Sequence, residues 1–310
     1  MVIHMRYRIA SFNMKNWGRN PSRDFEKISD IIVEEDLDIV AFQEIWSEGA
    51  GVKRLLQEDV KHQLYNWDLH WAVPRETRDL TKIEETISRR SEGYAYIWNA
   101  RKFKLTETTT LQGAIRKYEP RIVQRHASSF VRAPYYIRLQ PLYGGFFDLR
   151  LLNIHIYHGG SSTWSNIEKR KQEYATLVKE IYPEVSQRRY GDFRPAYTIA
   201  MGDYNLNIIR PNITDLPDDK GAFLNVDEEI ISIPQYGIVQ TFQDQKTTLK
   251  SKENGYANNF DHFTYSPDHS SFSDVSFQVI DAVEKYCDGD FSYYLKNISD
   301  HLPIVMEIEL

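Results

Sequence analysis

The sequence has one cysteine, Cys287, in 310 residues. A lone thiol excludes an internal disulfide framework, which is typical of small secreted proteins. The chain also lacks a run of eighteen apolar residues, so no membrane-spanning helix is predicted. Its first residues, MVIHMRYRIASF, lack the basic start and long apolar core of a secretory leader. We therefore expect a cytoplasmic protein without a membrane span.

Basic residues are also fewer than acidic residues. The 38 Lys and Arg residues face 44 Asp and Glu residues, and the formal net charge is -6. This balance argues against bulk attraction to nucleic acid, although a site that binds metal cations would itself lower the net charge. Basic residues gather locally in IRKYEPRIVQRHASSFVR at 115–132, which contains one acid. Such a run is either a solvated face or a surface that faces phosphate.

Strand and helix patterns alternate along much of the chain. Helices are predicted in SRDFEKISDIIVEE from Ser22 and in SNIEKRKQEYATLVKEIY from Ser165. The polar stretch 206–258 is interpreted as loops. Because no repeat, linker or composition break is found, residues 1–310 are predicted to form one layered α/β domain. The predicted strands are the apolar runs YRIASF at 7, LDIVAF at 37, YAYIW at 94, FDLRLLNIHIY at 147, AYTIAM at 196, FDHFTY at 260 and LPIVMEIEL at 302.

Side chains that can bind a metal ion or transfer a proton lie at the ends of several predicted strands. Alternate side chains of an extended chain share a face, so Asp203 and Asn205 in MGDYN can be directed at one point. A soluble domain rarely places many acids and histidines beside apolar strands without a shared partner. Carboxylate and amide oxygens favour Mg²⁺ or Mn²⁺ as that partner, whereas zinc favours His and Cys. The strand-end side chains are Asn13, Glu44, His155, Asp203, Asn205, Asp261, Asp300 and His301.

Five motifs occur in a fixed order, namely FNMKNWG, FQEIW, IHIYH, MGDYN and SDHLP. Together they resemble the endonuclease/exonuclease/phosphatase superfamily and, within it, the deoxyribonuclease I branch. The resemblance extends from about residue 8 to residue 310. It implies a four-layer α/β sandwich, in which two packed, mostly antiparallel sheets are flanked by helices. It also implies hydrolysis of phosphodiester or phosphomonoester bonds with a divalent metal.

The resemblance assigns a metal site and a phosphate site to individual residues. Glu44 matches the main metal ligand, with Asn13 beside it and Asp300 nearby. Asp203 and Asn205 match the pair that orients the attacking water and the phosphate. The implied cofactor is Mg²⁺ or Mn²⁺.

Two histidine and carboxylate pairs are implied in the same way. His301 matches a histidine held by Asp261, and His155 matches a second catalytic histidine whose partner is Glu92. A carboxylate fixes the tautomer of an imidazole and raises its pKa, so each pair suits general acid or base catalysis. Which histidine is the acid and which the base stays open. Taken alone, a histidine in a strand is more often structural, and Glu92 lies in RRSE, an ordinary charged turn.

The substrate is predicted from two basic residues that match phosphate-facing positions of deoxyribonuclease I. Lys15 acts as a point charge, whereas the guanidinium of Arg132 can bind phosphate bidentately. We therefore predict a metal-dependent DNA endonuclease. Trp46 and Arg90 replace residues that contact the duplex in that enzyme, so either duplex recognition differs or the substrate is not ordinary duplex DNA. The alternatives are a phosphomonoesterase or a lipid or inositol-phosphate hydrolase of the same superfamily, or a catalytically silent relative that binds nucleic acid or a protein.

Overall fold

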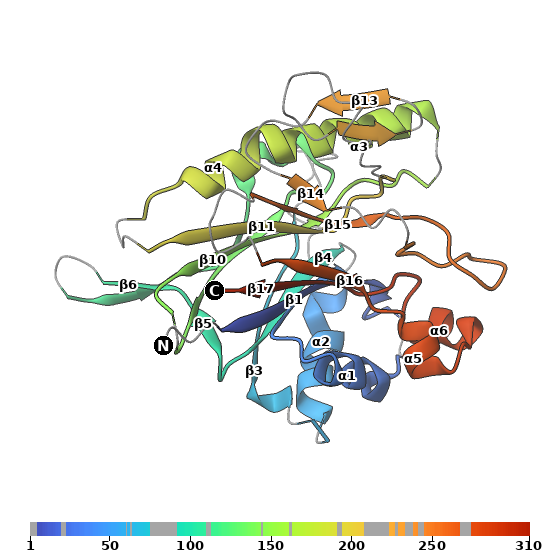
Figure 1. The fold of residues 1–310 in the computed structure, drawn as a ribbon, viewed down its shortest axis with the longest axis horizontal. Helices are drawn as coiled ribbons and strands as arrows, with labels where there is room; N and C mark the ends of the chain where they lie inside the picture. Colours follow the sequence, from blue (N-terminus) through green and yellow to red (C-terminus); the bar gives the residue numbers. More distant parts are fainter. Residues whose placement is uncertain are drawn as a thin grey trace.

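Two β-sheets are packed face to face in the computed structural model, and helices cover both outer faces (Figure 1). The predicted four-layer α/β sandwich is therefore confirmed. Among the helices that the structure describes, none is long and apolar enough to cross a membrane. The described residues are 5–19, 23–59, 61–62, 64–74, 92–109, 113–143, 145–160, 163–190, 194–207, 223–226, 229–232, 238–240, 245–266 and 274–310.

The first sheet has six strands in the order β16-β17-β1-β2-β4-β3. Its central strands β1 and β2 pair in parallel, and the other described neighbours pair antiparallel. The strands are β1 (Arg6–Trp17), β2 (Ile39–Ile45), β3 (Trp67–Ala72), β4 (Gly93–Asn99), β16 (Ser276–Val279) and β17 (Ile304–Glu309).

The second sheet has seven strands and repeats this plan. Strands β10 and β11 at its centre pair in parallel, and its order is β14-β15-β11-β10-β9-β5, with β8 also paired to β9. The strands are β5 (Phe103–Leu105), β8 (Arg121–Ile122), β9 (Tyr135–Pro141), β10 (Asp148–His155), β11 (Ala196–Asp203), β14 (Ile238–Gln240) and β15 (Asp261–Tyr265). Two separate hairpins pair β6 (Glu107–Thr109) with β7 (Ile115–Lys117) and β12 (Phe223–Val226) with β13 (Glu229–Ser232).

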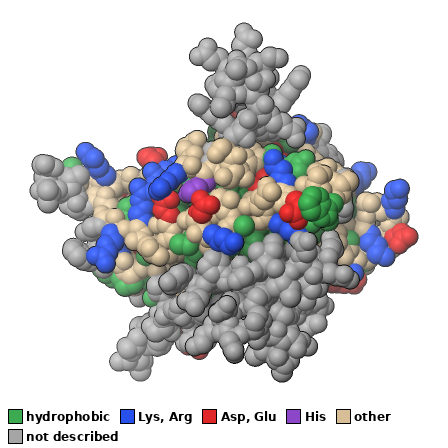
Figure 2. All heavy atoms as spheres, turned by 90° about the horizontal axis from the view of Figure 1, so that it is seen from above, with side chains coloured by type: hydrophobic (Ala, Val, Ile, Leu, Met, Phe, Trp, Pro, Cys, Tyr) green, Lys and Arg blue, Asp and Glu red, His purple; other side chains and the backbone are tan. Residues whose placement is uncertain are grey.

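Helices complete the two outer layers. The first sheet is covered by α1 (Phe25–Glu34), α2 (Ala50–Glu58), α5 (Ala282–Cys287) and α6 (Phe291–Asn297), and the second by α3 (Trp164–Thr176) and α4 (Tyr182–Gln187). A π-helical turn, Leu177–Ile181, joins α3 to α4. Short 3₁₀ turns lie at Ser47–Gly49, Leu64–Asn66 and Gln124–Ser129. On the face seen from above, charged side chains of both signs are interspersed (Figure 2).

The alternation of side chains along β1 decides which face each residue occupies. Tyr7 and Ile9 pack in the core between the sheets, whereas Ala10 and Phe12 pack in the core beneath the helices. Odd-numbered positions of this strand therefore face the second sheet. Asn13 follows the same parity and is fully buried between the sheets.

The seven strands predicted from apolar runs are confirmed, but three other predictions need correction. Helix α1 was expected from Ser22, which lies outside the described residues, and its N-cap is Asp24, whose carboxylate accepts a hydrogen bond from Lys27 N at 3.0 Å. Helix α3 begins at Trp164, one residue before Ser165. The stretch 206–258, predicted as loops, contains β12, β13 and β14. Strands this short show too few alternations to be distinguished from loops by pattern.

The backbone of the second sheet leaves no room for a side chain at Gly202. Its φ is +151°, and a Cβ atom there would lie 1.9 Å from the carbonyl oxygen of Ile154 on the neighbouring strand. Replacing Gly202 with Ala is expected to lower the free energy of unfolding by roughly 3 kcal/mol or more, because β10 and β11 must separate to admit the methyl group. Urea unfolding followed by circular dichroism measures this loss.

Gly113→Ala is the matched control. Gly113 also has a positive φ, +80°, but no atom lies within 4 Å of a Cβ built there. Its replacement is expected to cost about 1 kcal/mol from backbone strain alone. Equal losses in the two variants would contradict a steric role for the Ile154 contact.

Candidate active site

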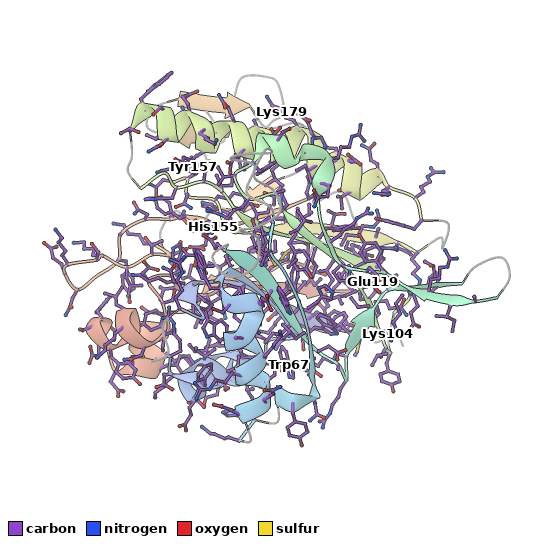
Figure 3. All side chains as sticks on the ribbon, turned by 180° about the vertical axis from the view of Figure 1, so that it is seen from behind. Trp67, Lys104, Glu119, His155, Tyr157 and Lys179 are labelled. Carbon is purple, nitrogen blue, oxygen red and sulfur yellow. The ribbon has the colours of Figure 1, made fainter. Side chains whose placement is uncertain are left out.

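A cavity of ≈ 500 Å³ lies at the ends of the central strands of both sheets. It opens where β10 and β11 end in His155 and Asp203, and where β2 presents Glu44. In Figure 3, the label of His155 lies near the middle of the molecule, and that of Tyr157 lies between it and helix α3. The predicted site residues that line the cavity are Glu44, Glu92, Arg132, His155, Asp203, Asn205, Asp300 and His301.

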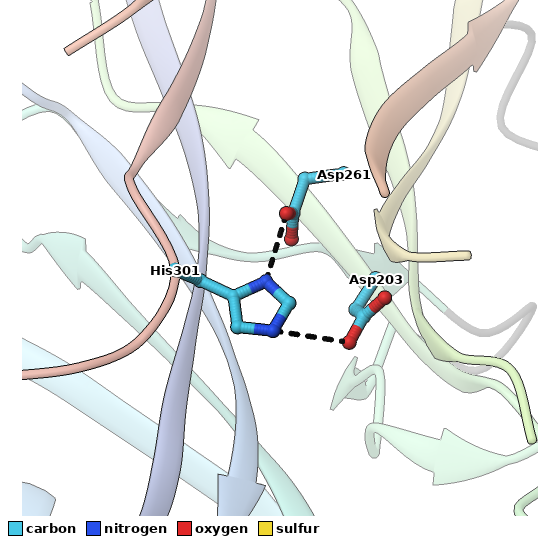
Figure 4. Close-up of side chains that lie close together, drawn as sticks. All are labelled: Asp203, Asp261 and His301. Atoms are coloured by element: carbon cyan, nitrogen blue, oxygen red, sulfur yellow. Dashed lines mark hydrogen bonds and ion pairs between the residues drawn. The ribbon is translucent and has the colours of Figure 1, made fainter. Parts of the chain in front are cut away.

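His301 is held by a buried carboxylate. Its Nδ1 lies 2.8 Å from Oδ2 of Asp261, and the same oxygen accepts a hydrogen bond from the Thr247 hydroxyl at 2.6 Å. Figure 4 shows how the imidazole is placed between two acids, with Asp261 on one side and Asp203 on the other. Burial by itself lowers the pKa of His301, but Asp261 and Asp203 outweigh it and raise that pKa well above its usual value.

His155 forms the second pair, as predicted from the motifs. Its Nδ1 is hydrogen-bonded to Oε1 of Glu92, and the Arg132 guanidinium lies 3.2 Å from the same oxygen. Burial and the Arg132 charge lower the pKa of His155, yet Glu92 and Asp203 reverse this, and the net pKa is raised. Arg132 also donates to the carbonyl oxygens of His155 and Ile156, each at 3.3 Å. It therefore fixes the Glu92 carboxylate as well as lining the cavity.

Both imidazoles face the same oxygen of Asp203. Oδ2 of Asp203 lies 3.5 Å from Nε2 of His155 and 3.6 Å from Nε2 of His301. The Asn13 side-chain amide donates to this oxygen at 2.9 Å, which links the first sheet to the second. The other oxygen, Oδ1, accepts a hydrogen bond from the backbone N–H of Asn205 at 2.8 Å. The site is thus a carboxylate flanked by two proton-carrying rings.

Glu44 is the carboxylate that best fits a hard cation. It stands in a positive-φ conformation, φ 57°, which directs it out of the regular strand. Its Oε2 accepts a hydrogen bond from the backbone N–H of Asn16 at 2.8 Å, and its Oε1 accepts one from Asn13 at 3.2 Å. Burial raises the pKa of the Glu44 carboxyl, so the charged form gains from a nearby cation.

Asp300 adds a second carboxylate to the cavity. Its Oδ1 is buried without a hydrogen-bond partner among the described residues, and its Oδ2 accepts from Lys15 Nζ at 2.8 Å. An orphaned carboxylate oxygen beside Glu44 suits Mg²⁺ or Mn²⁺, which prefer oxygen ligands. Asn13 shares the region, but its oxygen accepts from the backbone N–H of Lys15 at 3.0 Å. Lys15 itself is oriented by Asp300.

A different group of three also lies close enough to hold an ion. Asp203, Asp261 and His301 each present one ligand atom within 4.8 Å of the others. However, a metal ligand must be free of its proton, and the bonds from His301 and Thr247 already occupy Oδ2 of Asp261. These contacts fit proton transfer better than metal binding.

Helix α3 supplies two supporting residues that the sequence did not identify. Glu173 is fully buried, and its two oxygens accept the backbone N–H groups of Val131 and Tyr157, each at 2.9 Å. One turn earlier, Arg170 donates to the carbonyl oxygens of His158 and Asn205, each at 3.2 Å. These bonds fix the segments that contain Arg132, His155 and Asn205. In the sequence, EKRKQEY has the composition of a solvated helix face, so no signal distinguished them.

One of the two positions at which the sequence departs from the deoxyribonuclease I branch can be compared with the structure. Trp46 is only 8% exposed, and the Arg19 guanidinium lies 3.3 Å from its ring centroid. A side chain buried in this way is not available to enter a DNA groove. Arg90 lies outside the described residues.

Solved structures share this arrangement of layers. A humanized D. rerio TDP2 has a TM-score of 0.58 at 15% identity, with 98% of each chain covered. ANGEL2, described as a 2′,3′-cyclic phosphatase, has a TM-score of 0.56 at 14% identity, with 99% of this chain and 96% of that chain covered. An endonuclease/exonuclease/phosphatase from Bacteroides vulgatus has a TM-score of 0.52 at 13% identity, with 99% of each chain covered.

The chain has the deoxyribonuclease I-like fold of the endonuclease/exonuclease/phosphatase superfamily. Searches with protein-family models and among curated proteins found no match to the sequence. At identities of 13–15%, the likeness shows the fold alone and leaves the activity and the substrate to be argued from the site.

Magnesium is expected to stabilise the folded protein through Glu44. An ion that binds only the folded state adds about 2.7 kcal/mol at a hundredfold excess over its Kd, so the melting temperature should rise by several degrees. Glu44→Gln should remove most of that rise, because an amide is a weaker ligand for a hard cation. Differential scanning fluorimetry, with EDTA as the baseline, measures the rise in melting temperature in the wild type and in Glu44→Gln.

Glu58→Gln is the control for this experiment. Glu58 is an exposed residue of α2 that pairs with Arg54 at 2.8 Å. The magnesium-induced rise should be the same in this variant as in the wild type. A full rise in Glu44→Gln would show that the ion is bound elsewhere.

Proposed function

We propose that this protein is a divalent-metal-dependent phosphodiester hydrolase that acts on nucleic acid, with DNA as its substrate. The observation that supports the proposal is the convergence of two imidazoles on one carboxylate. His155 and His301 are each held at Nδ1 by an acid, and each presents Nε2 to Asp203 in a cavity of ≈ 500 Å³. Hydrolysis of a phosphoester needs proton transfer on both sides of phosphorus, and two such rings can supply it.

Each residue of the site has a role in this chemistry. One imidazole accepts a proton from the attacking water, and the other donates a proton to the departing oxygen. Asp203 lies between the rings, where it orients Nε2 of each and can hold the water by a hydrogen bond. Glu92 and Asp261 keep Nδ1 protonated, so that Nε2 is the nitrogen directed at the cavity.

A divalent cation would be held by Glu44 and Asp300. When bound, such an ion acts as a Lewis acid that neutralises charge on the phosphate. The chain prepares this position by placing both half-buried carboxylates at the cavity lined by the two imidazoles.

Nucleic acid is favoured as substrate by the polar lining of the cavity and by two basic residues of the site. Arg132 lines the cavity and is held by Glu92 and by the carbonyl oxygen of His155. Lys15 pairs with Asp300, which lines the cavity. Phosphate contacts of this kind bind a backbone without reading its sequence. ANGEL2, which has the same fold, was solved with adenosine-2′,3′-vanadate, a nucleoside derivative.

The purified protein is expected to cleave DNA only with Mg²⁺ or Mn²⁺. Plasmid, single-stranded DNA, RNA and phosphoinositides are incubated with it, with and without EDTA, and the products are separated by electrophoresis or chromatography. Cleavage that resists EDTA would exclude the metal requirement. Turnover of phosphoinositides alone, or of RNA alone, would replace DNA as the substrate.

Each histidine pair is expected to act as a unit. His155→Ala and His301→Ala should each reduce the chemical step by about two orders of magnitude or more, which is the usual contribution of a positioned acid or base. Glu92→Gln and Asp261→Asn should reproduce much of the loss of their partners. Combining both changes within a pair should add little to the single change. Single-turnover kinetics on the substrate found above measure these effects.

His62→Ala is the matched control for the histidine variants. Its Nε2 lies 2.7 Å from Asp30 Oδ1, so it forms another histidine and carboxylate pair, but it does not line the active-site cavity. Turnover should stay near the wild-type value. Wild-type turnover in both His155→Ala and Glu92→Gln, together with loss in His301→Ala, would indicate a site with one catalytic histidine.

A further inference from the structure

A third histidine, His158, lines the active-site cavity and has no role in the chemistry proposed above. It lies three residues beyond His155, the last residue of β10. Its side chain is exposed, so a substrate in the cavity can reach it. The charges of Asp203, His155 and His301 all act on the pKa of His158, which places its ring close to them. The ring therefore lies beside the groups that are proposed to transfer protons.

The backbone around His158 is held in place by helix α3 without help from the His158 ring. Arg170 donates a hydrogen bond to the carbonyl oxygen of His158 at 3.2 Å. The side-chain amide of Asn166 donates to the carbonyl oxygen of Gly159 at 3.0 Å. Both bonds are formed by side chains of α3 and accepted by the backbone. The imidazole is thus available for a contact with the substrate.

One bond of the His158 ring decides which of its nitrogens carries the proton. Nδ1 accepts a hydrogen bond from the backbone N–H of Gly160 at 3.2 Å, so the proton of the neutral ring is on Nε2. Partial loss of hydration and the Arg170 charge lower the pKa of His158, against the opposing effect of Asp203. The ring is therefore neutral at neutral pH, unlike a ring whose pKa is raised.

The Nε2–H group of His158 has no hydrogen-bond partner among the residues that the structure describes. Since Nδ1 is occupied by Gly160, Nε2–H is the group that the ring can offer to a ligand. The cavity thus has an unpaired neutral donor close to two histidines that are held by carboxylates.

We propose that Nε2–H of His158 donates a hydrogen bond to a non-bridging oxygen of the scissile phosphate. The inference rests on the hydrolase function proposed above and adds a substrate-binding residue to it. A fixed donor stabilises the negative charge that develops on such an oxygen during the reaction. Because the ring is neutral, it does so without taking part in the proton transfers of His155 and His301.

The two sheets can contact the phosphate from different sides. Glu44, a candidate cation ligand, belongs to β2 of the first sheet, whereas His158 follows β10 of the second. A phosphodiester has two non-bridging oxygens. A cation at Glu44 would neutralise one of them, and His158 would bind the other.

Two amide variants separate this role from a structural one. His158→Asn keeps an acceptor near the position of Nδ1 for the Gly160 N–H, but it has no donor at the position of Nε2. His158→Gln places an amide N–H near the position of Nε2. With bis(p-nitrophenyl) phosphate and Mg²⁺, kcat is expected to fall about tenfold or more in His158→Asn and to stay within about threefold of wild type in His158→Gln.

The opposite order of the two variants would show that the ring serves only to hold the turn, and would overturn the proposal. Equal losses in both variants, or wild-type turnover in His158→Asn, would overturn it as well. In these cases the hydrolase function would stand. If the wild type hydrolysed neither this diester nor the nucleic acids tested above, the hydrolase function would fail and this inference with it.

The pH dependence of kcat/KM distinguishes a neutral donor from a third proton carrier. A donor that stays neutral does not titrate in the working range, so both limbs of the wild-type profile should be kept in His158→Gln. Disappearance of one limb in this variant would assign a proton transfer to His158 and overturn the proposal.

Phosphorothioate substrates identify the oxygen that His158 contacts. Single-stranded DNA oligomers are prepared with all linkages in the Rp or all in the Sp configuration, so that sulfur replaces one non-bridging oxygen or the other. Sulfur is a weaker hydrogen-bond acceptor than oxygen. Single-turnover rates should therefore show, for one configuration, a smaller sulfur penalty in His158→Asn than in the wild type. Equal penalties in the two proteins for both configurations would overturn the proposed contact.

Discussion

A few buried hydrogen bonds between the two sheets hold the whole site in register. Gln43 of β2 donates to the Asn153 side chain of β10 at 2.7 Å, and Asn153 donates to the carbonyl oxygens of Phe42 and Ala95. If the sheets slid by one residue, these buried polar groups would lose their partners, at a cost of about 1–3 kcal/mol each. His155 follows Asn153 by two positions and therefore faces the same way. The alignment that keeps Asn153 paired also directs His155 into the cavity.

Charge is distributed unevenly along the seven-stranded sheet. At the end of β10, His155 meets an excess of carboxylates, which suits cations and imidazolium groups. At its start, Asp148 pairs with the guanidinium groups of Arg138 and Arg150. About seven residues of extended chain, roughly 23 Å, separate these two ends. The net charge of -6 is a sum over the whole chain and describes neither end. Local charge, and not the total, decides what the active-site cavity attracts.

The residues of the candidate site were largely predictable because motif positions coincide with strand ends. Glu44, Asp203 and His301 line one cavity, as their places next to the ends of predicted strands indicated. The supporting residues were not predictable. Glu173 and Arg170 lie in a helix whose sequence is charged on every side, and only the packing of α3 against the active-site segments buries them. Burial of a charged residue depends on what covers it, which local sequence does not record.

The sequence by itself determined seven of the strands, including the central pair of each sheet, the helical stretches of α1 and α3, the face on which each residue of those strands lies and the identity of the chemical groups. Periodicity is a local property, and a period of two residues is enough to assign a side chain to a face. The tertiary structure alone decided which groups meet. Asn13 and Asp203 are 190 residues apart in the chain, yet their side chains are 2.9 Å apart. It also decided that Arg132 fixes Glu92 and that two arginines share Asp148. Such partners are set by the packing of one sheet on the other, and no local pattern encodes that packing.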